Sequence, residues 1–455
     1  MDPAIITLCV LGVAAFLFIT ELIPLAVTAM AACTALGILG VLPSKAVYAG
    51  MSNSTVVLFG GMFVIGAAMF KTGLAEAIGV AVVKKAGTNE IPLMAAIMTV
   101  TIILSAVSSN TGTVACLMPV IIGICSVAKL PASKQLMPLA IAANVGGTIT
   151  MIGTPPNVIV TGALTTAGLP TFGFFEFAWI GIPLSLIITV YTLFIGRHFV
   201  AAKSAGAMDE EALKAAKEEA GASGDDAPKS KTKMWISGLI LIGVVLCMAL
   251  DLKTVPLHTA AVTGAILCVV TGCLKEKEAY AGIDWVTIFL FAGMLSVASA
   301  MEKTGAGKLI ADTVVSMMGT NPNPYVLTAV LFLISNVLTQ FMSNTASAAL
   351  LAPIGISIAQ SIGADPKPVL MALGIAASCA FATPMATPPN TLVLGPGGFS
   401  FNDYAKVGVP MCLLSLVICL VVIPIVWLFA RGAHIGNYLR QFCYLAHRAL
   451  SLCYP

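Results

Sequence analysis

The chain carries little charge for its length. Only 9% of its 455 residues are Asp, Glu, Lys or Arg, whereas 58% are hydrophobic and the mean hydropathy is +1.00. A soluble domain carries about 25% charged residues, so this composition excludes an ordinary cytosolic enzyme and a disordered chain. The net charge of +3 is also too small to favour nucleic-acid binding.

Motifs for metal binding and disulfide chemistry are also missing. The twelve cysteines form no CxxC pair and the four histidines form no HExxH pair, so zinc chemistry lacks its ligands. The apolar segments hold no paired carboxylates, catalytic histidine or nucleophile beside a base, so we expect no enzymatic activity. No basic stretch precedes the first apolar run, and residues 4–19 are predicted to span a membrane rather than to form a cleaved signal peptide.

The sequence does contain a series of long apolar runs. A helix needs about 20 apolar residues to cross a bilayer, and roughly ten segments approach that length. A polar segment at 198–233 divides them into two sets, so we expect an all-α polytopic protein of the inner (plasma) membrane. The ten runs lie near residues 4–20, 24–41, 53–70, 134–153, 177–197, 234–251, 256–273, 284–301, 368–386 and 404–430.

The two halves of the chain are repeats. Tyr48–Gly73 aligns without gaps on Tyr280–Gly305 at an offset of 232, with 13 of 26 positions identical. An SNT motif at 109–111 recurs at 343–345, and a TPPN motif at 154–157 recurs at 387–390. We count about five crossings and one hairpin in each repeat, and an odd number of crossings would invert the second repeat relative to the first. Inverted repeats are typical of secondary transporters.

The repeats predict a domain organisation. The first inverted repeat covers 1–197, with a hairpin at 91–127 and a broken helix at 134–167. The second covers 234–430, with a hairpin at 324–361 and a broken helix at 368–397. Basic residues on and beside the 198–233 linker predict, by the positive-inside rule, that this linker is cytoplasmic. The role of the C-terminal tail, 431–455, stays open.

Each predicted hairpin carries a polar tip between two short apolar arms. An arm of about 16 residues reaches roughly 24 Å, which is too short to cross comfortably, so the tips are expected near the middle of the membrane. The second arm begins at the tip, and its N-terminal amides would favour an anion. The alternative is a pair of ordinary spans joined by a polar loop, or Ser and Thr side chains that pack between helices.

Each TPPN motif lies inside an apolar run. Two consecutive prolines remove two amide donors and clash with the preceding turn, so the helix is expected to unwind there. The freed carbonyls would suit a hard cation such as Na⁺, and the new helix N-terminus would suit an anion. The alternative is a structural proline kink.

None of these four motif regions contains Asp, Glu, Lys, Arg or His. Proton-coupled carriers usually need a titratable group inside the membrane. An anion held without Arg or Lys would instead need positive charge from helix dipoles and from bound Na⁺.

The paired SNT and TPPN motifs resemble those of the divalent anion/sodium symporter family, which includes INDY-type dicarboxylate transporters. The resemblance covers residues 1–430 and implies two Na⁺ sites with a carboxylate substrate between them, a homodimer and an elevator motion. It places the first Na⁺ site at Ser105, Ser109, Asn110 and Gly153. It places the second at Thr339, Ser343, Asn344 and Ala386. The substrate would meet Asn110, Thr111, Asn344 and Thr345, with Thr154 and Pro388 nearby.

The resulting prediction is a secondary active transporter for di- or tricarboxylates of the succinate, malate, fumarate or citrate type. Na⁺ is the expected coupling ion, and a lipid bilayer and a second copy of the chain are the expected partners. The alternatives are a Na⁺-independent dicarboxylate exchanger, a carrier of sulfate or another inorganic anion with the same fold, and an ion channel.

Overall fold

The computed structural model describes residues 2–87, 89–200, 202–203, 211, 230–250, 254–318 and 323–427. These residues form helices and connecting segments and no β-strand, which confirms the all-α class. Most of the predicted linker at 198–233 and the whole tail at 431–455 lie outside the described residues.

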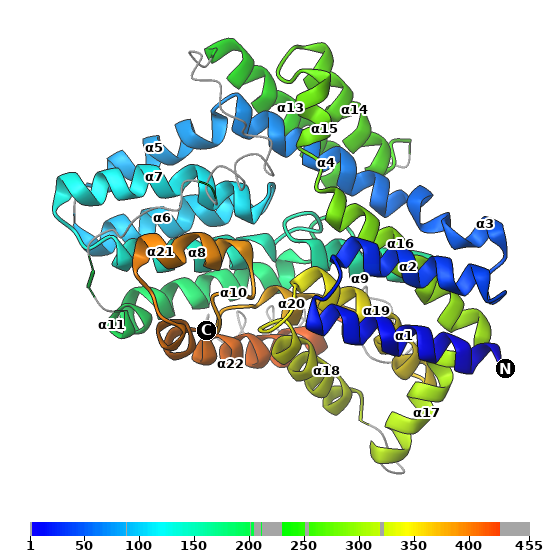
Figure 1. Cartoon of the computed structure of the whole chain (residues 1–455). Coiled ribbons are helices and arrows are strands. Elements are labelled where there is room, and N and C mark those ends of the chain that lie inside the picture. Colours follow the sequence, from blue (N-terminus) through cyan, green and yellow to red (C-terminus); the bar gives the residue numbers. More distant parts are fainter. Residues whose placement is uncertain are drawn as a thin grey trace, which may run out of the picture.

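The described helices of the two halves correspond in order and position (Figure 1). The main helices of the first half are α1 (Pro3–Thr20), α2 (Leu25–Ile38), α4 (Ser54–Lys71), α5 (Leu74–Ala86), α6 (Glu90–Ser105), α7 (Asn110–Ala128), α8 (Ser133–Gly147), α9 (Pro155–Thr166) and α10 (Ala178–Tyr191). Those of the second are α13 (Lys231–Ala249), α14 (Leu257–Val270), α16 (Trp285–Thr304), α17 (Ala306–Met318), α18 (Pro324–Leu338), α19 (Asn344–Ser361), α20 (Pro366–Ser378), α21 (Pro388–Gly397) and α22 (Phe401–Val426).

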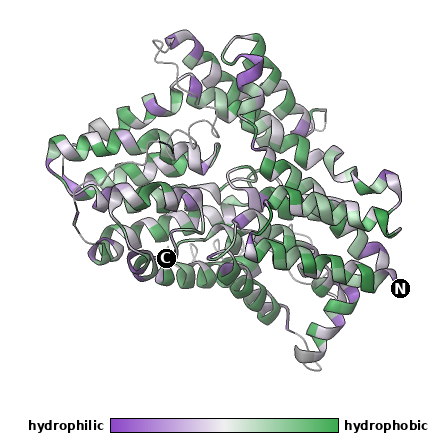
Figure 2. Cartoon of the chain, viewed as in Figure 1, coloured by the Kyte–Doolittle hydropathy of each residue, from purple (hydrophilic) through white to green (hydrophobic). Residues whose placement is uncertain are grey.

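The surface of the helices is apolar, as a lipid environment requires. Seven helices in the described part of the chain are long and apolar enough to cross a membrane, and four shorter apolar helices accompany them. Hydrophobic residues cover much of the long helices, whereas hydrophilic residues gather mainly near helix ends and connections (Figure 2). On α22, an exposed stripe repeats every four residues, which places it on one helix face. The stripe comprises Leu413, Val417, Val421 and Ile425.

The runs near 134–153 and 368–386 are not among these candidate spans. Their helices, α8 and α20, end at Gly147 and Ser378, and irregular backbone follows until α9 and α21 begin at Pro155 and Pro388. Nearly every residue of α8 and α20 is buried. The interrupted runs therefore form the inside of the protein rather than its lipid-facing surface.

The two halves interlock around these buried helices. α8 packs against α6, α7 and α21, and α20 packs against α18, α19 and α9. Each helix that follows an interruption therefore packs on the opposite half. This exchange brings the two SNT motifs and the two TPPN motifs to one place.

A second symmetric contact joins helices from the two halves. α4 lies against α14 and α2 lies against α16. A Cβ added to Gly61 would lie 2.8 Å from the carbonyl carbon of Ala261, and one added to Gly293 would lie 2.8 Å from the carbonyl carbon and oxygen of Ala29. These two glycine–alanine pairs are equivalent positions of the repeat, and they allow the backbones of the helices to approach closely.

We expect Gly293→Ala to destabilise the protein by about 1–3 kcal/mol, because the added methyl group meets backbone that cannot rotate away. Thermal unfolding in detergent measures the effect. The matched control is Gly243→Ala on α13, where an added Cβ would meet nothing within 4 Å. Equal midpoints for both variants would contradict the close approach of α2 and α16.

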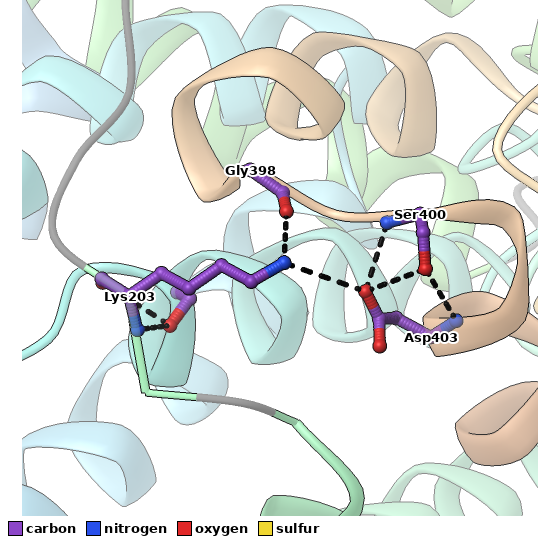
Figure 3. A network of polar contacts seen from close by, with 5 residues as sticks. Lys203, Gly398, Ser400 and Asp403 are labelled. Carbon is purple, nitrogen blue, oxygen red and sulfur yellow. Dashed lines mark hydrogen bonds and ion pairs between the residues drawn. The ribbon is translucent and has the colours of Figure 1, made fainter.

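The start of the polar linker is attached to helices that carry the motifs. Lys203 donates its backbone N–H to Oγ of Ser133 at 2.9 Å, and its Nζ contacts the carbonyl oxygen of Gly398 and lies 3.8 Å from Oδ2 of Asp403 (Figure 3). Asp403 and Ser400 form the capping box of α22. The Lys203 side chain is 43% exposed, so this ion pair contributes little to stability, but it places residue 203 beside α8 and α22.

Candidate functional site

The four motifs line one cavity of about 330 Å³. Helices α4 and α16 also line the cavity, mainly with apolar side chains. The motif residues that line the cavity are Ser108, Ser109, Asn110, Thr111, Gly153, Thr154, Pro155, Ser343, Asn344, Thr345, Ala386, Thr387, Pro388 and Pro389. Ser105 and Thr339 do not line it, because they lie one turn below the tips at the ends of α6 and α18.

Four helices begin at this cavity. Ser109 and Ser343 cap α7 and α19, and their hydroxyls accept hydrogen bonds from the backbone N–H groups of Gly112 and Ala346 at 3.3 and 3.1 Å. Thr154 and Thr387 precede α9 and α21 without a side-chain capping bond. The positive ends of four helix dipoles therefore converge on the cavity. Among the described residues, no basic side chain lies along its wall. Such an arrangement favours an anion.

The irregular segments before α9 and α21 are fixed by the asparagines of the TPPN motifs. Nδ2 of Asn157 donates to the carbonyl oxygen of Thr150 at 2.9 Å, and Nδ2 of Asn390 donates to that of Thr383 at 2.9 Å. Both asparagines are almost fully buried. The hydroxyl of Thr383 in turn donates to the carbonyl of Gln340 beside the second tip, at 2.6 Å. The fourth motif residue therefore holds the unwound backbone rather than facing the cavity.

The first tip is closed by the amide of Asn110. Its Nδ2 donates to the carbonyl oxygens of Ala143 and Gly153 at 3.1 and 3.2 Å. Rotation of this amide by 180° would replace the donor with Oδ1, and the three oxygens together would suit a hard cation.

The second tip repeats this arrangement with one addition. Nδ2 of Asn344 donates to the carbonyl oxygens of Ala386 and Ala377 at 3.0 and 3.2 Å and to the Thr339 hydroxyl at 2.6 Å. The hydroxyl of Thr339 in turn donates to the carbonyl oxygen of Ala377 at 2.8 Å. At the corresponding place in the first half, Oγ of Ser105 is fully buried and has no hydrogen-bond partner. Both hydroxyls therefore lie where a cation could use them.

The cation chemistry of these cages would rest on neutral oxygens. Within the described residues, no group of three or more His, Cys, Asp or Glu side chains could hold a metal ion. Carbonyl, amide and hydroxyl oxygens at this density fit Na⁺ better than a transition metal, which prefers nitrogen or sulfur ligands.

Two further cavity residues were not found from the sequence. Asn144 on α8 donates through Nδ2 to Oγ1 of Thr387 at 3.2 Å and to Oδ1 of Asn390 at 3.1 Å, which joins the two halves. Asp284, the residue before α16, also lines the cavity. The repeat gives no signal for Asn144, whose equivalent is Ala377, and Asp284 lies outside the four motifs.

Comparison with known proteins agrees with this architecture. A family model described as citrate transporter matches residues 15–366 and 348–451. An uncharacterized transporter of Haemophilus influenzae is 30% identical over 91% of this chain and 89% of its own length. The sodium-dependent dicarboxylate transporter SdcS of Staphylococcus saprophyticus is 26% identical over 89% of this chain and 83% of its own.

Among solved structures, the YdaH transporter of Alcanivorax borkumensis superposes with a TM-score of 0.63, covering 93% of this chain and 98% of YdaH at 15% identity. This likeness concerns the fold alone. The family model and the relatives are all transporters rather than enzymes. The chain therefore belongs to the citrate transporter family, among the divalent anion/sodium symporters that its SNT and TPPN motifs resemble, and is a polytopic secondary transporter of the plasma membrane.

Proposed function

We propose that this transporter moves di- or tricarboxylates of the succinate, malate, fumarate or citrate type together with Na⁺. The observation that carries the proposal is the cavity in which both SNT tips and both TPPN helix starts meet, each tip with an asparagine amide against two carbonyl oxygens. The name of the staphylococcal relative, a sodium-dependent dicarboxylate transporter, supports the same assignment.

Na⁺ would bind at the two oxygen cages beneath the tips. The proposed ligands of the first ion are the side chains of Ser105, Ser109 and Asn110 with the carbonyl of Gly153. Those of the second are the side chains of Thr339, Ser343 and Asn344 with the carbonyl of Ala386. The unpartnered hydroxyl of Ser105 supports the first assignment, because a buried polar group without a partner costs about 1–3 kcal/mol until something satisfies it.

The substrate carboxylates would bind between the two ions, with Asn110, Thr111, Asn344 and Thr345 as donors and with Thr154 and Pro388 beside them. Among the residues that the structure describes, no Lys or Arg lines the cavity. Without cations, the four helix N-termini would have to balance two or three negative charges. Two Na⁺ ions would supply two positive charges. Coupling then follows from electrostatics, because the anion binds well only after the cations have entered.

An elevator motion fits the position of the cavity. The hairpin and broken-helix elements line it together with α4 and α16. Displacement of the motif-bearing helices along α4 and α16 would carry the site from one face of the membrane to the other. We further propose that the repeats are inverted, that the 198–233 linker is cytoplasmic and that the protein is a homodimer.

Uptake of labelled succinate into proteoliposomes tests the function. We expect uptake driven by an inward Na⁺ gradient and little uptake when K⁺ or choline replaces Na⁺. The control is vesicles without protein. Saturation with succinate and a steep temperature dependence would separate a carrier from a channel.

The other outcomes identify the alternatives. Uptake that ignores Na⁺ and needs vesicles preloaded with dicarboxylate would identify an exchanger. Uptake of labelled sulfate that neither succinate nor citrate inhibits would identify an inorganic anion carrier. Either result would overturn the proposal of Na⁺–carboxylate symport.

A further inference from the structure

One ionisable side chain, that of Asp284, lines the cavity among the residues that the structure describes there. Oδ1 of Asp284 accepts a hydrogen bond from the backbone N–H of Thr287 at 3.0 Å, and Oδ2 accepts one from the Thr287 hydroxyl. Thr287 also lines the cavity. These two bonds hold a carboxylate at the wall of a cavity whose other features favour an anion.

Capping α16 does not by itself require this charge. The equivalent helix of the first half, α4, is capped by Asn53, whose Oδ1 accepts from the backbone N–H of Thr55 at 2.8 Å. Asn and Asp are about equally good at this position of a helix. Asn53 is not among the residues that line the cavity. Of these two capping residues, only the negatively charged one, Asp284, lines the cavity.

From this placement we propose that Asp284 is a specificity-determining residue that disfavours trianionic substrates relative to dianionic ones. This inference rests on the proposed carboxylate transport and narrows its substrate class to dicarboxylates. The interaction of a bound anion with every charge around the cavity grows in proportion to the charge of the anion. The attraction of the helix N-termini and cations and the repulsion of Asp284 are therefore both half as large again for a trianion as for a dianion. Asp284 makes the potential of the cavity less positive, so it lowers the advantage that a trianion would otherwise have.

The hydrogen bonds of Asp284 suit a fixed repulsive charge better than a ligand. Asp284 caps α16, outside the four motifs, and both of its oxygens already accept hydrogen bonds from Thr287. A fixed charge of this kind rejects a competitor without contributing a bond to the preferred substrate, which is how specificity can be obtained by repulsion.

The test replaces Asp284 with Asn in the full-length protein. Labelled succinate uptake is measured at pH 8 with saturating Na⁺, and unlabelled succinate or citrate is added as competitor. We expect the ratio of half-inhibitory citrate to half-inhibitory succinate to fall about three- to tenfold in Asp284→Asn, with a smaller difference at high ionic strength. Asp284→Ser, a second neutral capping residue, should behave in the same way if the asparagine variant folds poorly.

Asp365→Asn is the matched control. Asp365 caps α20 by accepting from the backbone N–H of Lys367 at 2.9 Å, and it does not line the cavity. Its removal should leave the citrate-to-succinate ratio unchanged. The shift in melting temperature that each anion produces in detergent provides a second readout that does not depend on transport.

The outcomes separate the two proposals. If the wild-type protein takes up succinate but both neutral variants keep its ratio of half-inhibitory citrate to half-inhibitory succinate, Asp284 does not determine specificity. The transport proposal then stands. If the ratio shifts equally in Asp365→Asn, a general change of surface charge explains it, and again Asp284 does not determine specificity. If the wild-type protein neither takes up nor is stabilised by succinate or citrate, both proposals fall.

Discussion

Alanine at Asn110 or at Asn344 is expected to reduce Na⁺-dependent succinate uptake strongly and to raise the half-saturating Na⁺ concentration about 10- to 100-fold. Each asparagine amide lies against two carbonyl oxygens at its tip, to which its nitrogen donates, and rotation of the amide would offer Oδ1 to a cation. Without the amide, those carbonyls lose both the hydrogen-bond donor and the cation ligand. The affinity for Na⁺ falls, and the affinity for the carboxylate falls with it.

The measurement is initial uptake rate against Na⁺ concentration in proteoliposomes, at several succinate concentrations. Asn89→Ala is the control, because Asn89 is an exposed residue before α6 whose side chain makes no capping bond. A variant that lost rate without any change in its Na⁺ dependence would place that asparagine in substrate binding only. Normal uptake by either variant would show that the site around that asparagine does not bind the coupling Na⁺.

Much of this geometry could be anticipated because it occurs twice in the sequence. A tip that begins a helix, and two prolines that interrupt one, are local features with physical consequences that do not depend on the rest of the chain. The same holds for Gly61 and Gly293, which recur at one offset because both helix pairs need a close approach. A repeat therefore reveals whatever both halves require.

Residues needed in only one half could not be found in that way. Asn144 joins α8 to the second TPPN motif, but the equivalent position is Ala377. Asp284 reaches the cavity only because the start of α16 lines it beside the motifs. The sequence also did not predict that Asn157 and Asn390 fix unwound backbone, since that role depends on where the irregular segment folds back. All of these are tertiary contacts between distant segments.

The two cages also differ in a way that the repeat alone does not explain. A Cβ added to Gly147 would lie 2.8 Å from both Oδ1 and Nδ2 of Asn110 and 2.9 Å from the carbonyl oxygen of Gly153. The equivalent position in the second half is Ala380, which already carries a methyl group. The first cage therefore has room for its asparagine only because residue 147 lacks a side chain.

This difference predicts a large effect from one added methyl group. We expect Gly147→Ala to displace the Asn110 amide and to raise the half-saturating Na⁺ concentration at least about tenfold, because overpacking of a tight site costs about 1–3 kcal/mol. The same measurement of uptake against Na⁺ concentration applies, with thermal unfolding in detergent to establish that the variant is folded.

The chain offers two matched controls for this prediction. Gly123→Ala adds the same methyl group to α7, where nothing lies within 4 Å of the new Cβ, and it should transport normally. Ala380→Gly makes the second half like the first. We expect it to lower the free energy of unfolding by at most about 0.5–1 kcal/mol, the usual penalty of glycine within a helix. If Gly147→Ala kept the Na⁺ dependence of the unaltered protein, the cation would have to bind away from Asn110, and the first site would need to be sought elsewhere along the cavity.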